Sequence, residues 1–126
     1  MKLRIKGNSI RLRLTQREVH ALGNGETVEE STRFSQTTTF TYAICPSPTN
    51  APISASFEHN RLSVSIASQA LREWAENDVV GFEHDQFVGN GETLRLLIEK
   101  DFACLKPRVG EDDADAYANP MQGQSC

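Results

Sequence analysis

The chain has 126 residues, of which 38% are apolar and 24% charged, so it can bury the core of one globular domain without metals or disulfide bonds. No apolar run approaches the roughly 20 residues of a membrane span, and the basic N-terminal stretch has the alternation of a strand, which argues against a signal peptide. The net charge of −4 gives no overall attraction to nucleic acid, and Cys45, Cys104 and Cys126 have no paired spacing, which favours free thiols in a reducing cytoplasm.

The first fourteen residues predict a β-hairpin. Apolar and basic side chains alternate along them, which is the period of a half-buried strand. The apolar set is Leu3, Ile5, Ile10, Leu12 and Leu14, and the basic set is Lys2, Arg4, Lys6, Arg11 and Arg13. Gly7-Asn8-Ser9 interrupts the alternation with residues that suit a tight turn. We therefore expect antiparallel strands over residues 2–7 and 9–15.

A short helix and two further strands are predicted after the hairpin. Thr15 and Glu18 have the spacing of a capping box, in which each side chain accepts a hydrogen bond from the other residue's backbone N–H. Gly23 predicts the helix end, because glycine readily adopts the left-handed conformation of a C-cap. Residues 27–34 and 38–44 are rich in Thr, Val, Phe and Tyr, which favour strands.

Residues 45–52 interrupt this pattern and predict a linker. They contain three prolines, which continue neither a helix nor the interior of a sheet. Residues 67–76 then predict a second helix. Strands are predicted over residues 79–88 and 93–100, joined by the hairpin turn signal Gly89-Asn90-Gly91.

The two halves of the chain share a pattern of apolar positions. When the sequence is shifted by 52 positions, the apolar residues of 1–45 fall mostly on apolar residues of 53–102, as when Leu12 meets Val64. We predict two pseudo-repeated units, each with the order strand, strand, helix, strand, strand. Chance agreement between two β-rich halves is the alternative.

The predicted fold is α+β and mostly antiparallel β. The two units should form a closed or partly open barrel of about eight strands, with the two short helices capping its ends. An open two-layer sheet with both helices on one face is the alternative. We expect residues 1–110 to form a single domain and residues 111–126 to form an acidic, flexible tail.

The strongest functional signal is the segregation of charge near the N-terminus. The strand pattern places Lys2, Arg4, Lys6, Arg11 and Arg13 on one face of one hairpin, here called the basic hairpin face, and residues 1–17 contain no acidic side chain. Such a face can bind phosphate, nucleic acid or an acidic partner. The alternative is a solvated face, or one that is neutralised by the acidic residues 111–115. The absence of interleaved aromatic residues weakens a role in binding single-stranded nucleic acid.

Residues 99–104 contain the only candidates for a reactive site. Alternation places Glu99 and Asp101 on one face of a strand, close in sequence to Cys104. A cysteine nucleophile needs a base beside it, and the sequence does not provide one at a recognisable spacing. No Cys or His spacing of a zinc site is present, and the acidic residues 111–115 lack the spacing of a calcium-binding loop, so no metal or cofactor is predicted.

Three stretches carry a resemblance to a known family. They are KLRIKGNSIRLRL at residues 2–14, EKDFACL at residues 99–105, and the acidic end that contains Asn119-Pro120. Through them the chain resembles, over nearly its whole length, a family of small uncharacterised bacterial proteins of unknown function. This resemblance implies no activity, ligand or site.

A more local likeness covers residues 7–28. GNSIRLRLTQREV at residues 7–19 and GETV at residues 25–28 are similar to the swapped-hairpin pattern of antitoxins and transition-state regulators. In that pattern strand, strand, helix and strand precede dimerisation and DNA binding. This sequence lacks the Leu-Pro before the helix, has Gly25-Glu26 in place of Gly-Asp, and continues into a second unit. The likeness implies that two such units in one chain could close a barrel that shorter proteins build as dimers.

These observations favour a small, non-catalytic, cytoplasmic binding protein that uses the basic hairpin face for an anionic ligand or an acidic protein. A DNA-binding regulator is the first alternative, although the net charge disfavours nucleic acid. An enzyme that uses Glu99, Asp101 and Cys104 is the second. No membrane partner is expected, and the sequence leaves the ligand and the oligomeric state open.

Overall fold

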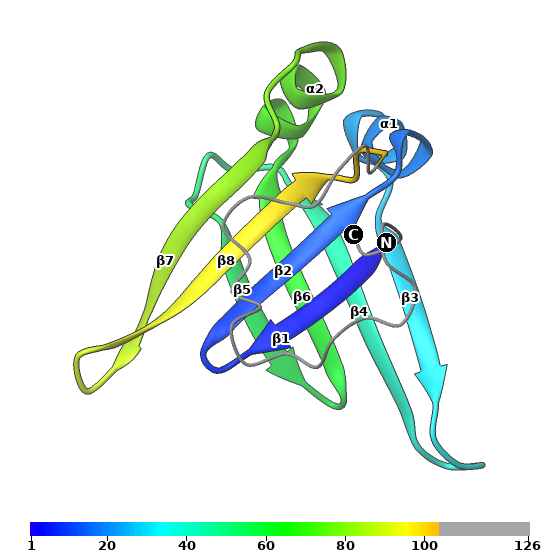
Figure 1. The fold of residues 1–126 in the computed structure, drawn as a ribbon, viewed down its shortest axis with the longest axis vertical. Helices are drawn as coiled ribbons and strands as arrows, with labels where there is room; N and C mark the ends of the chain where they lie inside the picture. Colours follow the sequence, from blue (N-terminus) through cyan, green and yellow to red (C-terminus); the bar gives the residue numbers. More distant parts are fainter. Residues whose placement is uncertain (104–126) are drawn as a thin grey trace, which may run out of the picture.

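Four β-hairpins supply all the strands of residues 1–103, the part of the chain that this computed structural model describes (Figure 1). The strands are β1 (Lys2–Lys6), β2 (Ser9–Leu14), β3 (Val28–Arg33), β4 (Thr39–Ser47), β5 (Ser54–Glu58), β6 (Arg61–Ala67), β7 (Gly81–Gly89) and β8 (Glu92–Lys100). The helices are α1 (Gln16–Gly23) and α2 (Ser68–Glu76). These bounds confirm the predicted α+β class, with mostly strands and two short helices.

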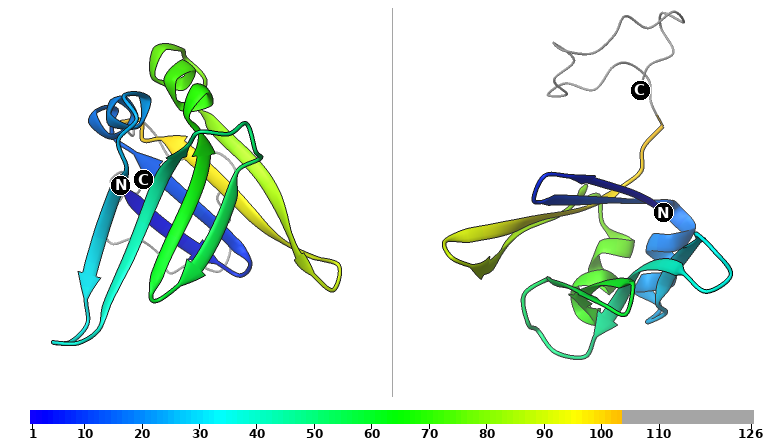
Figure 2. Two further views of the ribbon diagram at one scale, coloured as in Figure 1. Left: turned by 180° about the vertical axis from the view of Figure 1, so that it is seen from behind. Right: turned by 90° about the horizontal axis from the view of Figure 1, so that it is seen from below.

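The hairpins combine into two four-stranded sheets, with strand orders β1-β2-β8-β7 and β3-β4-β6-β5. Within each sheet the antiparallel hairpins join along a central parallel pair, β2 with β8 in one sheet and β4 with β6 in the other. The two sheets face one another as layers, and the two helices lie together at one end (Figures 1 and 2). Each sheet therefore takes one hairpin from each half of the chain.

The predicted barrel, closed or partly open, is not confirmed, and a closed barrel is absent because no strand ladder joins the two sheets within residues 1–103. Side chains bridge them instead. Between β7 and β5, the Gln86 amide accepts from the Ala55 backbone N–H at 2.7 Å and donates to the Ala55 carbonyl at 2.9 Å. At the opposite seam the amino group of Met1, which precedes β1, donates to Glu30 of β3 at 2.9 Å. These bonds hold the sheet edges together without the continuous backbone pairing that closes a barrel.

The predicted capping box of α1 is confirmed, but the predicted end of this helix is wrong. The Glu18 backbone N–H donates to Thr15 Oγ1, and the Thr15 backbone N–H donates to the Glu18 carboxylate. Gly23 is the last helical residue, whereas Gly25 takes the left-handed conformation with φ at +89°. The backbone N–H groups of Gly25 and Glu26 donate back into the last turn, as in a Schellman motif. Either glycine of Gly23-Asn24-Gly25 suits a C-cap, and the sequence alone could not choose between them.

Apolar side chains from both sheets and both helices form one core. Its buried members are Ile10, Leu12, Leu14, Val19, Leu22, Ile44, Leu62, Val64, Ile66, Leu71, Trp74, Leu96 and Ile98. The Trp74 indole N–H donates to the Val79 carbonyl at 2.9 Å, and its ring centroid lies 5.0 Å from that of Phe82. Trp74 therefore connects α2 with Val79, just before β7, and with Phe82 in β7.

Strand β4 extends three residues into the segment 45–52 that was expected to be a linker. Pro46 pairs in register with Ile66 of β6. A proline is tolerated there because β3 begins with Val28, opposite Ile44, so the part of β4 after Ile44 has a neighbour on one side only. Among the described residues, no helix is both long enough and apolar enough to cross a membrane.

Candidate binding sites

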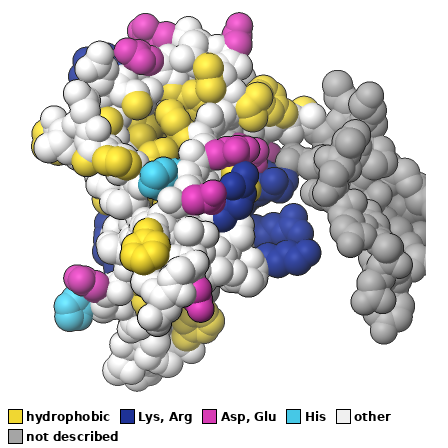
Figure 3. Space-filling model, turned by 90° about the vertical axis from the view of Figure 1, so that its left-hand side faces the viewer, with side chains coloured by type: hydrophobic (Ala, Val, Ile, Leu, Met, Phe, Trp, Pro, Cys, Tyr) yellow, Lys and Arg dark blue, Asp and Glu magenta, His cyan; other side chains and the backbone are white. Residues whose placement is uncertain are grey.

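The outer face of the sheet β1-β2-β8-β7 carries all five residues of the basic hairpin face. Strand register places Lys2 opposite Arg13 and Arg4 opposite Arg11, so like charges lie directly across the hairpin. Such pairs destabilise a sheet unless carboxylates or solvent offset them. The basic side chains gather on one side of the molecule in the view of Figure 3.

The neighbouring strands supply carboxylates to this outer face. The Glu99 carboxylate forms an ion pair with Arg11 Nε at 3.1 Å, and the Asp101 carboxylate lies 2.9 Å from Lys2 Nζ. On the far side of the face, the Arg95 guanidinium pairs with β7 carboxylates at 3.2 Å. The cations of the whole face are Lys2, Arg4, Lys6, Arg11, Arg13 and Arg95, and the carboxylates are Glu83, Asp85, Glu99 and Asp101. Six cations minus four carboxylates leave a formal excess of +2.

Two of the three candidates for a reactive site therefore lie on this face as ion-pair partners of cations. Glu99 pairs with a side chain of β2 and Asp101 with one of β1. Cys104, and the acidic residues 111–115 that were the alternative partner of the face, lie outside the described residues. Within residues 1–103, no group of three His, Cys, Asp or Glu side chains could hold a metal ion.

A second charged cluster lies where Met1 meets the other sheet. The Met1 amino group donates to Glu18 at 2.7 Å and to Glu30 at 2.9 Å, and the Tyr42 hydroxyl donates to Glu30 at 2.8 Å. Burial opposes the charge on the amino group, but the hydrogen bonds to the two carboxylates outweigh it and raise its pKa. The hydrogen bonds that Glu30 accepts from the Met1 amino group and from the Tyr42 hydroxyl lower the pKa of Glu30. Burial, followed by the hydrogen bond to Glu30, raises the pKa of Tyr42 to about 12. This cluster uses its charges to join the sheets.

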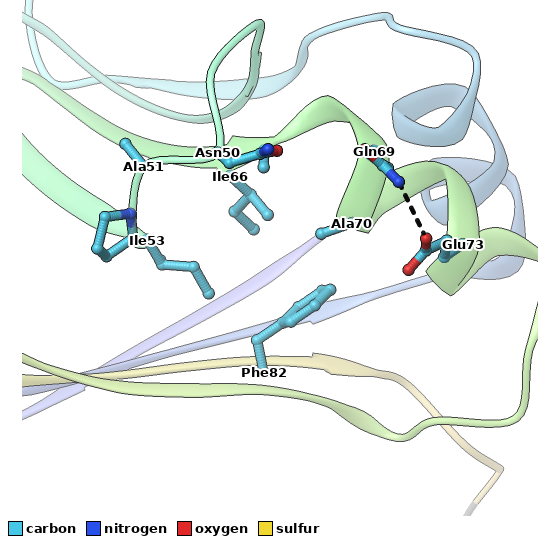
Figure 4. A pocket seen from close by; sticks show the side chains of 10 residues that line it. Asn50, Ala51, Ile53, Ile66, Gln69, Ala70, Glu73 and Phe82 are labelled. Atoms are coloured by element: carbon cyan, nitrogen blue, oxygen red, sulfur yellow. Dashed lines mark hydrogen bonds between the residues drawn. The ribbon is translucent and has the colours of Figure 1, made fainter.

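The structure also contains a cleft that sequence reasoning missed. It has a volume of about 420 Å³ and lies between α2, the segment before β5 and the start of β7 (Figure 4). Its lining comes from residues 50–53, from Ile66, Ala67, Gln69, Ala70 and Glu73, and from Phe82. Prolines in the linker signalled an irregular loop, but no local pattern indicates which helix or strand such a loop faces.

Comparison with known proteins places the chain in a family without assigning it an activity. No curated protein and no solved structure matches it. The model of one family matches residues 1–121, which confirms the resemblance seen in the sequence. The chain therefore belongs to a family of unknown function, DUF7009.

Proposed function

We propose that this protein is a non-catalytic binding protein whose basic hairpin face receives an acidic segment of a partner protein. The observation that carries the proposal is the excess of two positive charges on one outer sheet face, in a chain whose net charge is −4. Separation of charge against the net sign of a protein attracts and orients an oppositely charged partner.

The excess is concentrated on one edge of the sheet. β1 is an edge strand, and its Lys2, Arg4 and Lys6 side chains are exposed. Of the carboxylates on the same face, Glu83 and Asp85 lie on β7 at the opposite edge, whereas Asp101 reaches Lys2 at the start of β1. An acidic segment that lies along β1 would therefore meet cations while it avoids the carboxylates of the other edge.

The internal ion pairs leave this face able to exchange partners. Lys2 is 71% exposed in its pair with Asp101, although the Asp101 side chain is only 17% exposed. The lysine ammonium therefore still faces solvent, where a partner carboxylate can also approach it. Glu99 and Arg11 are less exposed, and their pair fixes the orientation of the arginine beside the exposed cations.

A charge-reversal experiment tests the proposal. The probe is a fluorescently labelled decaglutamate peptide, and binding is measured by anisotropy at two salt concentrations. Arg4→Glu combined with Lys6→Glu changes the net charge by four and should abolish binding. Arg17→Glu combined with Arg72→Glu is the matched control, because both side chains are exposed on the helices and the net change is the same.

The control variant should keep most of the wild-type affinity for decaglutamate. The higher salt concentration should weaken peptide binding by the wild type and by the control variant. Equal losses in the two double variants would show that net charge, and not the basic hairpin face, determines binding. That result would overturn the proposal, as would the absence of any binding by the wild type at low salt.

A DNA-binding regulator is the second candidate. The exchange of hairpins between the two halves of the chain supports it, because this topology agrees with the swapped-hairpin likeness of residues 7–28. The carboxylates interleaved with the cations on β8 argue against close approach to a phosphate backbone. A labelled DNA duplex in the same assay separates the candidates, because a DNA-binding protein would bind it more tightly than decaglutamate and with a steep salt dependence.

We also propose that residues 1–45 and 53–102 are pseudo-repeats within one domain. Their elements follow the same order, and their hairpin turns make equivalent contacts. The Asn8 carbonyl accepts from the Arg95 backbone N–H, and the Asn60 carbonyl accepts from the Thr41 backbone N–H, each at 3.0 Å. The sharing of both sheets between the halves supports a single domain, since neither half retains a complete sheet of its own.

A further inference from the structure

The cleft beside α2 has the size and the walls of a small-molecule site. Its volume of about 420 Å³ lies in the usual range of ligand pockets, roughly 300–1,000 Å³. Ile53, Ile66, Ala70 and Phe82 give it an apolar floor, and the side chains of Ile53, Ile66 and Phe82 converge on the same space (Figure 4). Apolar side chains also gather below the acidic groups at the upper end of the molecule in Figure 3.

The packing around the cleft holds it open. Ile66 is 1% exposed and belongs to the core, while the Phe82 ring packs against the buried ring of Trp74. The Gln86 amide bonds to the Ala55 backbone farther along the same two strands, so β5 and β7 are held at a fixed separation. A site of this kind is formed before a ligand arrives, which reduces the entropic cost of binding.

One end of the cleft is polar and acidic. Glu73 and Gln69 lie one turn apart on α2, and Gln69 Nε2 donates to the Glu73 carboxylate over a long 3.4 Å. Asn50 adds an amide from the opposite wall. Among the residues that the structure describes, Glu73 forms no ion pair, so its carboxylate can accept from a positively charged group.

We propose that this cleft binds a small amine that carries an aromatic or branched aliphatic body. The apolar part lies on Ile53, Ala70 and Phe82, and the protonated amine donates to the Glu73 carboxylate in place of the Gln69 amide. Charge complementarity selects an amine over a carboxylic acid of the same shape. The site is separate from the basic hairpin face, which attracts the opposite charge.

The test compares two probes of similar size and opposite charge, 2-phenylethylamine and 3-phenylpropionate. Binding to the full-length protein is followed by backbone amide NMR shifts and by fluorescence of Trp74, the single tryptophan of the chain. The amine should shift the resonances of Ile53, Ala70 and Phe82 with saturation, and the acid should bind at least about fivefold more weakly.

Variants on α2 identify the contacts. Glu73→Gln should weaken amine binding about fivefold and remove the preference over the acid, because it deletes the charge and keeps the shape. Glu76→Gln is the matched control, since Glu76 is exposed on the same helix and does not line the cleft. Ala70→Leu should block both probes by filling the space.

Four outcomes would overturn the proposal. They are the absence of saturable shifts at 10 mM amine, equal binding of the two probes, equal effects of Glu73→Gln and Glu76→Gln, and unchanged binding to a folded Ala70→Leu variant. A fifth outcome is a change in the NMR shifts of Ile53, Ala70 and Phe82 when the protein concentration is raised without any probe, because a second copy of the chain would then fill the cleft.

Discussion

Replacement of Gly23 by alanine measures how closely α1 and α2 pack. A Cβ at this position would lie 2.7 Å from the Cβ of Ala75, whereas carbons in contact prefer about 3.5–4.0 Å. The helices must therefore move apart by about 1 Å. Overpacking of this kind costs roughly 1–3 kcal/mol, and the higher helix propensity of alanine offsets up to about 1 kcal/mol of it. We expect Gly23→Ala to lower the free energy of unfolding by about 1 kcal/mol.

A double-mutant cycle with Ala75→Gly separates this contact from a backbone effect. With the Ala75 methyl removed, Gly23→Ala should become neutral or stabilising, which gives a coupling energy of about 1–2 kcal/mol. Gly25→Ala is the control, because Gly25 has a φ of +89° and no atom within 4 Å of an added Cβ. Its cost of about 1–2 kcal/mol should be the same in both backgrounds. Urea unfolding followed by Trp74 fluorescence provides the free energies, and additive effects of Gly23→Ala and Ala75→Gly would refute the proposed contact.

Two further predictions concern the seams between the sheets. Burial and the hydrogen bond to Glu30 raise the pKa of Tyr42 to about 12. In a Tyr117→Phe variant Tyr42 is the only tyrosine, and its hydroxyl should titrate near pH 12 when phenolate absorbance is followed. A titration midpoint near pH 10 would contradict the contact with Glu30. Because the pKa of Tyr42 is about 10 in the unfolded chain, the protonated hydroxyl contributes its full stabilisation of the fold below pH 10, and this contribution is lost as the pH rises toward 12. Gln86→Leu should cost about 1–2 kcal/mol and accelerate hydrogen exchange at the Ala55 amide, since it removes the partners of the Ala55 backbone, and unchanged exchange there would show that the bridge is not formed in solution.

Local patterns predicted the strands and turns well, because their causes are local. Alternation along β2 set which side chains enter the core, and all three of its apolar residues are buried. The turn Gly89-Asn90-Gly91 has positive φ at Asn90 and Gly91, at 53° and 73°, as the hairpin signal requires. Each of these features depends on residues within a few positions of one another.

The pairing of hairpins could not be predicted in the same way. β2 pairs with β8 over a long sequence separation, and alternation shows which face of a strand is buried without showing its neighbour. The pairing matters for function because it brings Glu99 and Asp101 to the cations of the first hairpin. In the sequence these carboxylates were candidates for a reactive site because alternation placed them on one face of a strand close to Cys104, and no local pattern indicated their cationic partners. The cleft escaped prediction for the same reason, since three separate segments line it.

The cations of β1 permit a purely structural explanation as well as a functional one. β1 is a sheet edge, and charged side chains on an edge strand prevent it from pairing with another chain. Glutamate protects an edge as lysine does, so Arg4→Glu with Lys6→Glu should keep the oligomeric state of the wild type under either explanation. Arg4→Gln with Lys6→Gln removes the charges, and its association at high concentration would reveal edge protection. A charge-reversed variant that keeps the oligomeric state of the wild type but loses decaglutamate binding would therefore assign a binding role to the sign of these charges, beyond the protection that any charge provides.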